Sequence, residues 1–252
     1  MKDISLATSL LIAGFMIMMP LPSVTSGDPT IKTPVHTAEA ANRPVKARKL
    51  LLFKPPRVGR PKTRLVGGGT RGTASIVELS ALTPEQSGLT VQEQPSLFWY
   101  LSKTTTDPIE LIVSVDRAEQ PMLVTRLRPP SQPGIQRVRL TDYNISLKPG
   151  VTYRWFVALI TDPERRSKDI IAGGGVERIP LSDAIRSQLG QAQAEHVPHL
   201  YAEAGLWYDA LATISDLIDA TPADAGLRQQ RAALLEQVGL TSIAAYDATN
   251  GR

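Results

Sequence analysis

The residues of this chain whose types suit catalysis or metal binding are few and scattered. His196 and His199 stand three residues apart beside Glu195, a spacing that would place both imidazoles on one face of a helix. Pro198 lies between them and disturbs such a helix, and no third ligand is evident nearby. We therefore predict surface or helix-capping histidines and no metal site, with a two-histidine metal site as the alternative.

Carboxylates that might serve a hydrolase are Glu110, Asp116 and Asp142, but their spacing favours no shared site. The chain contains no nucleophile-elbow, zinc-protease, phosphate-loop or calcium-loop motif. With no Cys, it also has no disulfide, no thiolate metal ligand and no cysteine nucleophile. We predict a non-catalytic protein without a cofactor, and keep a hydrolase with an unfamiliar site as an alternative.

The N-terminal segment has the features of a signal peptide. Lys2 precedes an uncharged apolar stretch, Leu6–Met19, which Pro20 ends. At about 1.5 Å per residue this stretch spans only about 21 Å, short of the roughly 30 Å hydrocarbon core. We predict a signal peptide over residues 1–26, cleaved after Ser26 or else after Ala40, and export to the periplasm or the extracellular space. A retained N-terminal anchor is the alternative.

The overall charge of +4 hides a basic arm attached to a mildly acidic body. Residues 43–72 hold ten basic and no acidic side chains, whereas residues 73–252 hold 16 basic and 21 acidic ones. We predict that residues 27–72, rich in Pro and Gly, form a disordered arm. One functional interpretation is that its basic side chains, represented by Arg57, Arg60, Lys62 and Arg64, bind an anionic envelope polymer such as polysaccharide or peptidoglycan, or a membrane surface.

A block of like charges is usually a solvated linker, so we prefer that interpretation of the arm and keep polymer or membrane binding as the alternative. Nucleic acid is not an expected partner, because export separates the chain from it. Phe53 is also the only aromatic residue among the charges, and single-stranded nucleic acid is usually bound by stacking on several aromatic rings.

Residues 73–180 carry the pattern of a β-sandwich. Short apolar or alternating runs recur every 8–12 residues or so, with Pro- and Gly-containing turns between them, as in immunoglobulin-like domains. The expected strands are Ile76–Leu82, Ser96–Leu101, Ile109–Val115, Met122–Leu127, Arg137–Leu140, Thr152–Ile160 and Val176–Ile179. The predicted fold class is α+β, mainly β: an immunoglobulin- or fibronectin-III-like β-sandwich followed by a helical segment.

The segment from Leu147 to Val157 resembles the tyrosine-corner entry to strand F of a fibronectin type III domain. The resemblance implies that the hydroxyl of Tyr153 bonds to the backbone upstream and that Trp155 and Val157 point into the core.

Residues 181–240 predict helices, and residues 241–252 a flexible tail. The stretch from Gly205 through Ala210 to Pro222 resembles the second half of a tetratricopeptide repeat. One repeat is too little for a free-standing array, so these helices must dock on the sandwich or on a partner. We predict an interaction surface for an unknown protein partner at Leu206, Trp207 and Tyr208, with core packing of these side chains as the alternative.

Several motifs in ordered succession carry a family resemblance. They are Val66-Gly-Gly-Gly-Thr-Arg-Gly72, Leu79-Ser-Ala-Leu-Thr-Pro84, Gly88–Pro95 followed by Leu97-Phe-Trp-Tyr100, Tyr153-Arg-Trp155, Arg178-Ile179, Gly205-Leu-Trp-Tyr-Asp-Ala-Leu211 and Leu234-Leu-Glu-Gln-Val-Gly239. Together they resemble the bacterial, largely cyanobacterial family named domain of unknown function 928. The resemblance implies no activity and no catalytic residue. From the sequence we thus expect an exported protein-interaction or structural module of the cell envelope.

Overall fold

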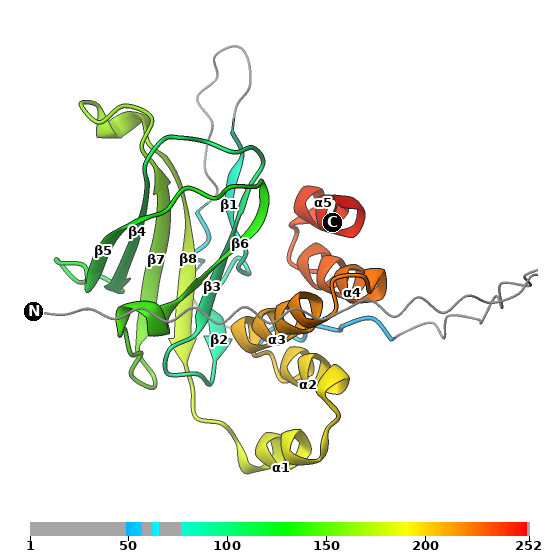
Figure 1. The fold of residues 1–252 in the computed structure, drawn as a ribbon. Helices are drawn as coiled ribbons and strands as arrows, with labels where there is room; N and C mark the ends of the chain where they lie inside the picture. The colour runs from blue at the N-terminus through cyan, green and yellow to red at the C-terminus, as the bar shows by residue number, and fades with distance from the viewer. Residues whose placement is uncertain (1–48, 57–61, 66–76, 251–252) are drawn as a thin grey trace, which may run out of the picture. The chain divides into compact units, whose positions relative to one another are not determined.

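The strands of this protein form two sheets. A computed structural model describes residues 49–56, 62–65 and 77–250 of the 252-residue chain. The strands are β1 (Leu79–Ala81), β2 (Gly88–Thr90), β3 (Ser96–Leu101), β4 (Ile109–Val115), β5 (Leu123–Leu127), β6 (Gly134–Arg139), β7 (Thr152–Leu159) and β8 (Ile170–Arg178). One sheet has the order β1-β3-β6 and the other the order β2-β8-β7-β4-β5 (Figure 1). All neighbours are antiparallel except β2 and β8, which run parallel.

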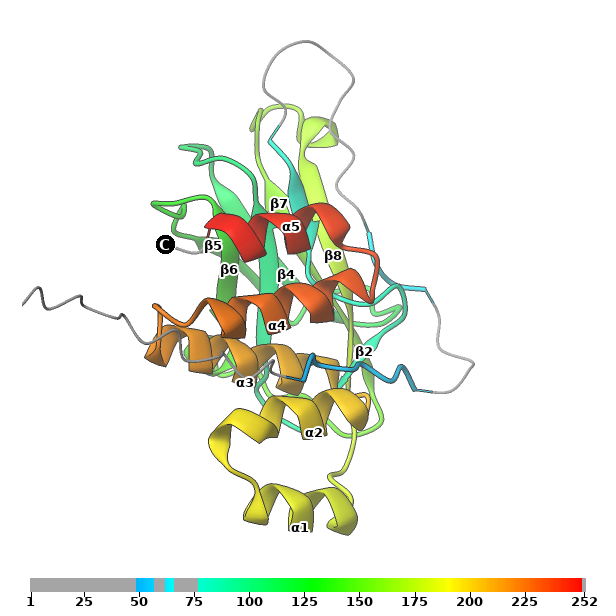
Figure 2. The ribbon, with the colours of Figure 1, turned by 90° about the vertical axis from the view of Figure 1, so that its right-hand side faces the viewer.

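The helices follow the strands in the chain, so the predicted α+β class is confirmed. They are α1 (Asp183–Gln191), α2 (Val197–Glu203), α3 (Trp207–Ala220), α4 (Ala225–Glu236) and α5 (Thr241–Asn250). Figure 2 shows α2, α3, α4 and α5 lying in a row, side by side. In the part of the chain that the structure describes, no helix combines the length and the apolar character needed to cross a membrane.

The core of the five-stranded sheet follows from alternation along β4 and β7. In β7 the side chains of Tyr153, Trp155 and Val157 are buried, while their neighbours towards the start of the strand are partly exposed. The Tyr153 hydroxyl accepts a hydrogen bond from the backbone N–H of Lys148 at 2.9 Å, which fixes the turn that leads into β7. This contact to the upstream backbone was predicted from the sequence.

Strand β8 is longer than predicted, because its glycines belong to the strand. A Cβ on Gly173 would lie 2.4 Å from the ring of Phe156, and one on Gly174 would lie 2.3 Å from Thr83. On the opposite face from Gly174, a Cβ on Gly175 would lie 2.3 Å from the hydroxyl of Ser87. At each glycine, the absence of a side chain lets a neighbouring group pack directly against the backbone of β8, and a larger residue would push that group away.

The three-stranded sheet is covered on both faces. All six residues of β3 are buried. Phe98 receives the guanidinium of Arg137 over its ring, and Tyr100 packs edge-on against Tyr246 of α5. Alternation directs Leu97, Trp99 and Leu101 the other way, towards the five-stranded sheet. The sheet thus lies between the second sheet and the helices (Figure 1).

The prediction of a flexible tail over residues 241–252 was wrong for residues 241–250, which form α5. Arg231 of α4 makes a two-point hydrogen-bonded ion pair with Asp247 of α5, with N–O distances of 2.8 and 2.6 Å, and also donates to Ser215 of α3 at 3.1 Å. Ile243 and Ala244 are buried. Both the ion pair and the apolar contacts therefore attach this helix to the body.

The prediction of a disordered arm over residues 27–72 was wrong for residues 49–56 and 62–65, which pack on the body. Leu51 and Phe53 are 1% and 7% exposed, and Phe53 lies edge-on against Trp207 at 5.1 Å between ring centres. Lys54 donates its backbone N–H to Ala202 of α2 at 3.1 Å. The rest of that arm, and the predicted signal peptide, lie outside the described residues.

Candidate functional site

The predicted interaction residues Leu206, Trp207 and Tyr208 are interior residues, which corrects their assignment as an exposed surface. Their exposed fractions are 3%, 0% and 1%. The indole N–H of Trp207 donates to the carbonyl oxygen of Leu82 at 2.9 Å. The alternative interpretation, that these side chains pack in the core, is therefore correct.

The hydroxyl of Tyr208 is the centre of a buried polar cluster. It accepts the indole N–H of Trp155 at 2.9 Å and donates to the carbonyl oxygen of Gly175 at 2.9 Å, with the Thr83 hydroxyl at 3.3 Å. Burial raises the pKa of Tyr208 to about 12, so the phenol stays protonated. The cluster joins α3 to β7 and β8 and has a structural role.

The basic residues assigned to polymer binding divide into two pairs. Arg57 and Arg60 lie outside the described residues. Lys62 pairs with Glu85 at 3.0 Å, and Arg64 donates to the carbonyl oxygens of Val238 at 2.7 Å and of Thr83 at 3.3 Å. Arg64 therefore connects the loop after β1 to the turn after α4, and its guanidinium donates hydrogen bonds within the chain.

The carboxylates considered for a hydrolase each have separate surroundings. Glu110 pairs with Arg166 at 2.7 Å, and Asp116 pairs with Arg154 at 2.9 Å. Asp142, in a short 3-10 helix, lines a small hollow that neither of the other two enters. The three do not form one site.

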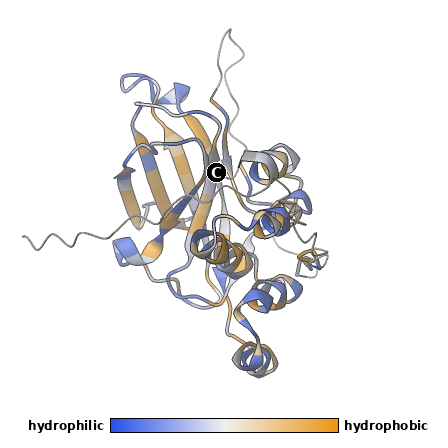
Figure 3. Ribbon diagram, turned by 45° about the vertical axis from the view of Figure 1, so that its right-hand side comes forward, coloured by the Kyte–Doolittle hydropathy of each residue, from blue (hydrophilic) through white to orange (hydrophobic). Residues whose placement is uncertain are grey.

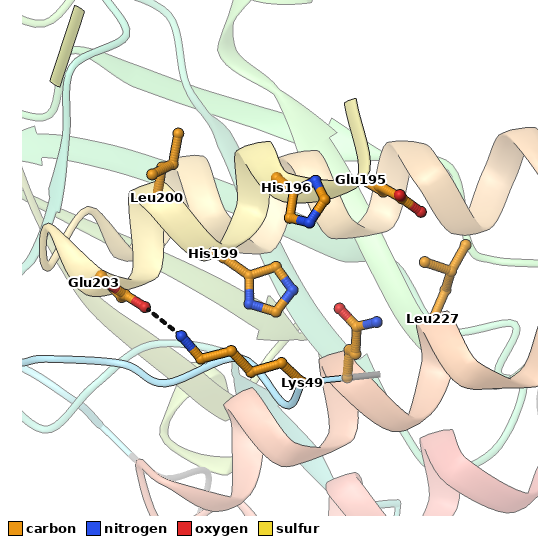
Figure 4. Close-up of a pocket in the computed structure, with 8 residues that line it drawn as sticks. Lys49, Glu195, His196, His199, Leu200, Glu203 and Leu227 are labelled. Atoms are coloured by element: carbon orange, nitrogen blue, oxygen red, sulfur yellow. Dashed lines mark hydrogen bonds and ion pairs between the residues drawn. The ribbon is translucent and has the colours of Figure 1, made fainter. Parts of the chain in front are cut away.

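A pocket between α2 and α4 gathers the histidines with residues from distant parts of the chain. We call it the α2–α4 pocket; its volume is about 340 Å³ and it is lined by Lys49, Glu195, His196, His199, Leu200, Glu203, Leu227 and Gln230. Figure 4 shows the two imidazoles beside Lys49, whose ammonium reaches towards Glu203. A pocket of this size suits a small molecule or a few side chains of a protein.

Pro198 shapes the histidine wall of this pocket. It occupies the first turn of α2, where its missing N–H breaks no helical hydrogen bond, so the helix starts there after a short 3-10 turn. His196 and His199 therefore sit at a helix start, with ring centres 6.3 Å apart. Within the described residues no three His, Asp or Glu side chains are grouped as metal ligands.

The charges in the α2–α4 pocket are arranged around one ion pair. Lys49 lies 3.2 Å from Glu203, and this hydrogen bond lowers the pKa of the carboxyl, which stays ionised. Burial lowers the pKa of His199, helped by His196 and Lys49. The His199 imidazole is therefore neutral at pH 7 and offers one donor and one acceptor.

Gln230 forms part of the pocket floor and is 3% exposed. Its amide oxygen is buried and makes no hydrogen bond of normal geometry, although the amide is close enough to raise the pKa of His199 against the effect of burial. Leu200 and Leu227 provide apolar surface beside it. A buried acceptor left wholly without a donor costs roughly 1–3 kcal/mol; a well-aligned ligand N–H or O–H would recover the part of this cost that the contact with His199 leaves.

Sequence reasoning noted the two histidines of this pocket and missed its other members. Lys49 and Gln230 are separated by most of the chain, and only the packing of residues 49–56 on α2 brings them together. The sequence signal was the apolar run Leu50–Phe53 inside a basic segment, which is unusual for a solvated linker.

A larger hollow, of about 660 Å³, lies between Phe53, Ser87 and Gln237. Its lining includes Pro56, the last described residue before residues 57–61, which lie outside the described part.

A protein-family comparison places the fold and the pocket in context. The model of the Domain of Unknown Function (DUF928) matches residues 66–247. The chain belongs to this family. The family predicted from the sequence is thus confirmed, and no curated protein matches the chain. The DUF928 match includes His196, His199 and Gln230, whereas Lys49 precedes it.

Proposed function

We propose that this DUF928 protein is an exported, non-catalytic protein-interaction module that receives part of a partner protein in the α2–α4 pocket. The observation that carries the proposal is the buried amide oxygen of Gln230, which makes no hydrogen bond of normal geometry although it lies beside His199, next to the apolar side chains of Leu200 and Leu227. An apolar side chain followed by a backbone N–H would fill the pocket and supply a well-aligned donor.

The charges at the pocket rim restrict the partner further. Glu195 is exposed, and Glu203 is ionised and shared between Lys49 and Lys54, at 3.2 and 3.8 Å. With His199 neutral, the lining carries a small negative charge at pH 7. A partner segment that places a basic residue near Glu195 is therefore favoured, and a strongly acidic one is disfavoured.

The scaffold class is part of the proposal. The strand order β1-β3-β6 and β2-β8-β7-β4-β5, and the hydrogen bond from Lys148 to Tyr153, support a fibronectin-III-like sandwich. The antiparallel packing of α2 on α3 about Gly205, with α4 and α5 following, supports a tetratricopeptide-like hairpin array. Both scaffolds serve binding more often than catalysis, an argument by analogy.

Export and the absence of catalysis rest on the sequence and on the separation of the carboxylates. The N-terminal apolar stretch Leu6–Met19 supports export to the periplasm or the extracellular space. Glu110, Asp116 and Asp142 have separate partners and hollows, which disfavours the hydrolase alternative. Binding of an envelope polymer through Arg57 and Arg60 stays a prediction, since both lie outside the described residues.

Site-specific photo-cross-linking in the native host tests the proposal. A photoreactive amino acid at Glu195, on the exposed pocket rim, should yield a defined adduct whose partner is identified by mass spectrometry. The same amino acid at Leu50, which is 58% exposed and outside the pocket, is the position control. Equal adduct patterns at the two positions would contradict the proposal.

Gln230→Leu in the Glu195 cross-linking background tests the carrying observation. It keeps the size of the side chain and removes the acceptor, so the specific adduct should fall at least fivefold. Gln229→Leu, at the exposed neighbouring position, makes the same chemical change outside the pocket and should leave the adduct unchanged. A loss that is equal in both variants would indicate a general effect on the protein.

A further inference from the structure

A polar hollow lies where β6, at the edge of the three-stranded sheet, faces α3. We call it the β6–α3 hollow; its volume is about 270 Å³, and its polar lining includes Gln92, Gln94, Arg137, Arg139, Asp209 and Asp216. Its lining contrasts with the strands of the five-stranded sheet, which are mainly hydrophobic along their length (Figure 3). A hollow of this size suits a small polar molecule.

Two arginines of β6 provide the positive charge of the hollow. Arg137 and Arg139 stand two residues apart, so alternation places both on the same face of the strand. Arg137 is held in position, because its Nε donates to the hydroxyl of Ser96 at 2.9 Å and its guanidinium lies over the ring of Phe98. It also pairs with Asp216 of α3. Its position is therefore fixed before any ligand arrives.

Arg139 is the positive charge that the chain leaves for a ligand. It is exposed, and its side chain makes no ion pair or hydrogen bond with any residue that the structure describes. The nearby carboxylate of Asp216 is already paired with Arg137. Because a planar guanidinium binds a carboxylate through two parallel hydrogen bonds, an acidic ligand finds an unused pair of donors here.

Asp209 provides a buried acceptor on the α3 side of the hollow. It is 3% exposed, and its Oδ2 accepts the N–H of Val91 at 3.1 Å. Burial raises the pKa of Asp209, and the side chains of Thr90 and Gln92 offset part of that rise. Its Oδ1 is nevertheless buried without a hydrogen bond of normal geometry. A well-aligned O–H of a ligand would satisfy this oxygen.

The other lining groups favour hydroxyl groups on the ligand. The amide of Gln94 makes no side-chain hydrogen bond among the described residues, and an amide offers both donors and an acceptor. The hydroxyl of Thr213 donates to the carbonyl oxygen of Asp209 at 2.7 Å, so it can only accept from a ligand. A hydroxyl group both donates and accepts, whereas an ammonium group only donates and would leave the amide N–H groups without an acceptor.

We propose that the β6–α3 hollow binds a small sugar acid, with the carboxylate on Arg139 and the hydroxyl groups on Asp209 and Gln94. Arg137 and Asp216 neutralise each other, so Arg139 and Asp209 are the two charges that the ligand meets. A ring that carries one carboxylate and several hydroxyl groups supplies an anion to the first and a donor to the second.

This inference does not depend on the partner proposed for the α2–α4 pocket. The two sites have no lining residue in common: Tyr201 of α2 lines the β6–α3 hollow, whereas the preceding residues His199 and Leu200 line the α2–α4 pocket. Binding of a sugar acid and binding of a protein partner can therefore succeed or fail separately.

Calorimetric titration of the full chain with D-glucuronate tests the proposal. We expect a dissociation constant of about 1 mM or lower. D-Glucose, which has the same ring and no carboxylate, should bind at least tenfold more weakly. No binding of D-glucuronate at about 20 mM, or equal affinities for the two sugars, would overturn the proposal.

Arg139→Gln tests the position of the carboxylate. The variant should bind D-glucuronate at least tenfold more weakly and D-glucose less than twofold more weakly, because only the carboxylate contacts the guanidinium. Arg126→Gln, the same change at an exposed arginine of β5 outside the hollow, should leave both affinities unchanged. Melting temperatures of the unbound variants show whether each is folded. Unchanged D-glucuronate binding by a folded Arg139→Gln variant, or an equal loss in Arg126→Gln, would overturn the assignment.

L-Serine tests the choice of hydroxyl groups over an ammonium group. It carries a carboxylate and one hydroxyl group, and its ammonium group could pair with Asp209. We expect it to bind at least tenfold more weakly than D-glucuronate. Tighter binding of L-serine would overturn the sugar acid in favour of an amino acid.

Discussion

The indole N–H of Trp155 in β7 donates to the hydroxyl of Tyr208 in α3, at 2.9 Å and out of reach of solvent. The two residues are separated by 53 positions in the chain. Because the same hydroxyl donates to the backbone of Gly175, one phenol satisfies a donor and an acceptor on neighbouring strands. The helices and the five-stranded sheet are therefore connected through a specific polar contact as well as through apolar packing.

Tyr208→Phe should destabilise the protein by about 1–3 kcal/mol, measured by urea denaturation. The substitution keeps the ring and leaves the buried Trp155 N–H without an acceptor, which is the costly way to lose a hydrogen bond. Tyr246→Phe is the matched control, because Tyr246 packs on Tyr100 through its ring and its hydroxyl has no hydrogen bond among the described residues. Its effect should stay below about 0.5 kcal/mol. Equal effects of the two substitutions would show that the buried cluster contributes nothing specific.

Features set by local sequence were predictable. Ser182 caps α1, and its hydroxyl accepts the N–H of Ile185 at 3.4 Å. The Pro-Gly turn before Tyr153 indicated the hydrogen bond between the Tyr153 hydroxyl and the backbone of Lys148. Gly239, with φ of 78°, has the left-handed conformation expected of a glycine that follows a helix, here α4. Strand β2 was missed, because three residues are too few to show an alternating pattern.

Features set by long-range contacts were not predictable. Trp207 and Tyr208 have residue types that serve both cores and interfaces, and only the position of the two sheets shows that they are buried. Helix α5 is held by the pairing of Asp247 with Arg231, which no local pattern marks. Lys49 enters the α2–α4 pocket from a segment whose charge had indicated a mobile arm.

Gly205→Ala should destabilise the protein by more than about 1 kcal/mol, measured as a lower melting temperature. Gly205 has φ of 76°, and a Cβ there would lie 2.8 Å from the carbonyl oxygen of Lys54. Gly190→Ala is the control: it lies inside α1 with nothing within 4 Å of the added Cβ, so it should stabilise by about 0.5–1 kcal/mol. A stabilised Gly205→Ala variant would contradict the close approach of residues 49–56.

Asp247→Ala should destabilise the protein by roughly 3–5 kcal/mol and make α5 sensitive to limited proteolysis. It leaves the guanidinium of Arg231, which is 9% exposed, buried without its carboxylate. The double variant Arg231→Met with Asp247→Leu removes both charges and should recover most of that stability. If the double variant is more stable than Asp247→Ala, the loss in the single variant comes from the unpaired charge of Arg231 and not from a general loss of packing. A double variant less stable than Asp247→Ala would contradict this account.

Asp209 should make the stability of the protein fall as the pH rises. It lies in the first turn of α3, 3% exposed, and burial raises its pKa from 3.8 to about 6, although the N–H of Val91 donates to it at 3.1 Å. The folded state therefore holds this proton more tightly than the unfolded state. The stabilisation is complete below about pH 4, declines as the pH rises, and is lost above about pH 6; its full size is about 2–3 kcal/mol.

Asp209→Asn isolates this contribution from those of other titrating groups. The amide oxygen can still accept the Val91 N–H, and the side chain no longer ionises. Both proteins are denatured with urea at pH 4.5 and at pH 7.5. Between these pH values the free energy of unfolding of the original protein should fall by about 2 kcal/mol more than that of the variant. An identical pH dependence of stability in the two proteins would contradict this account. It would show that the pKa of Asp209 is the same in the folded and unfolded states, so that burial between α3 and the loop after β2 does not disfavour the ionised form.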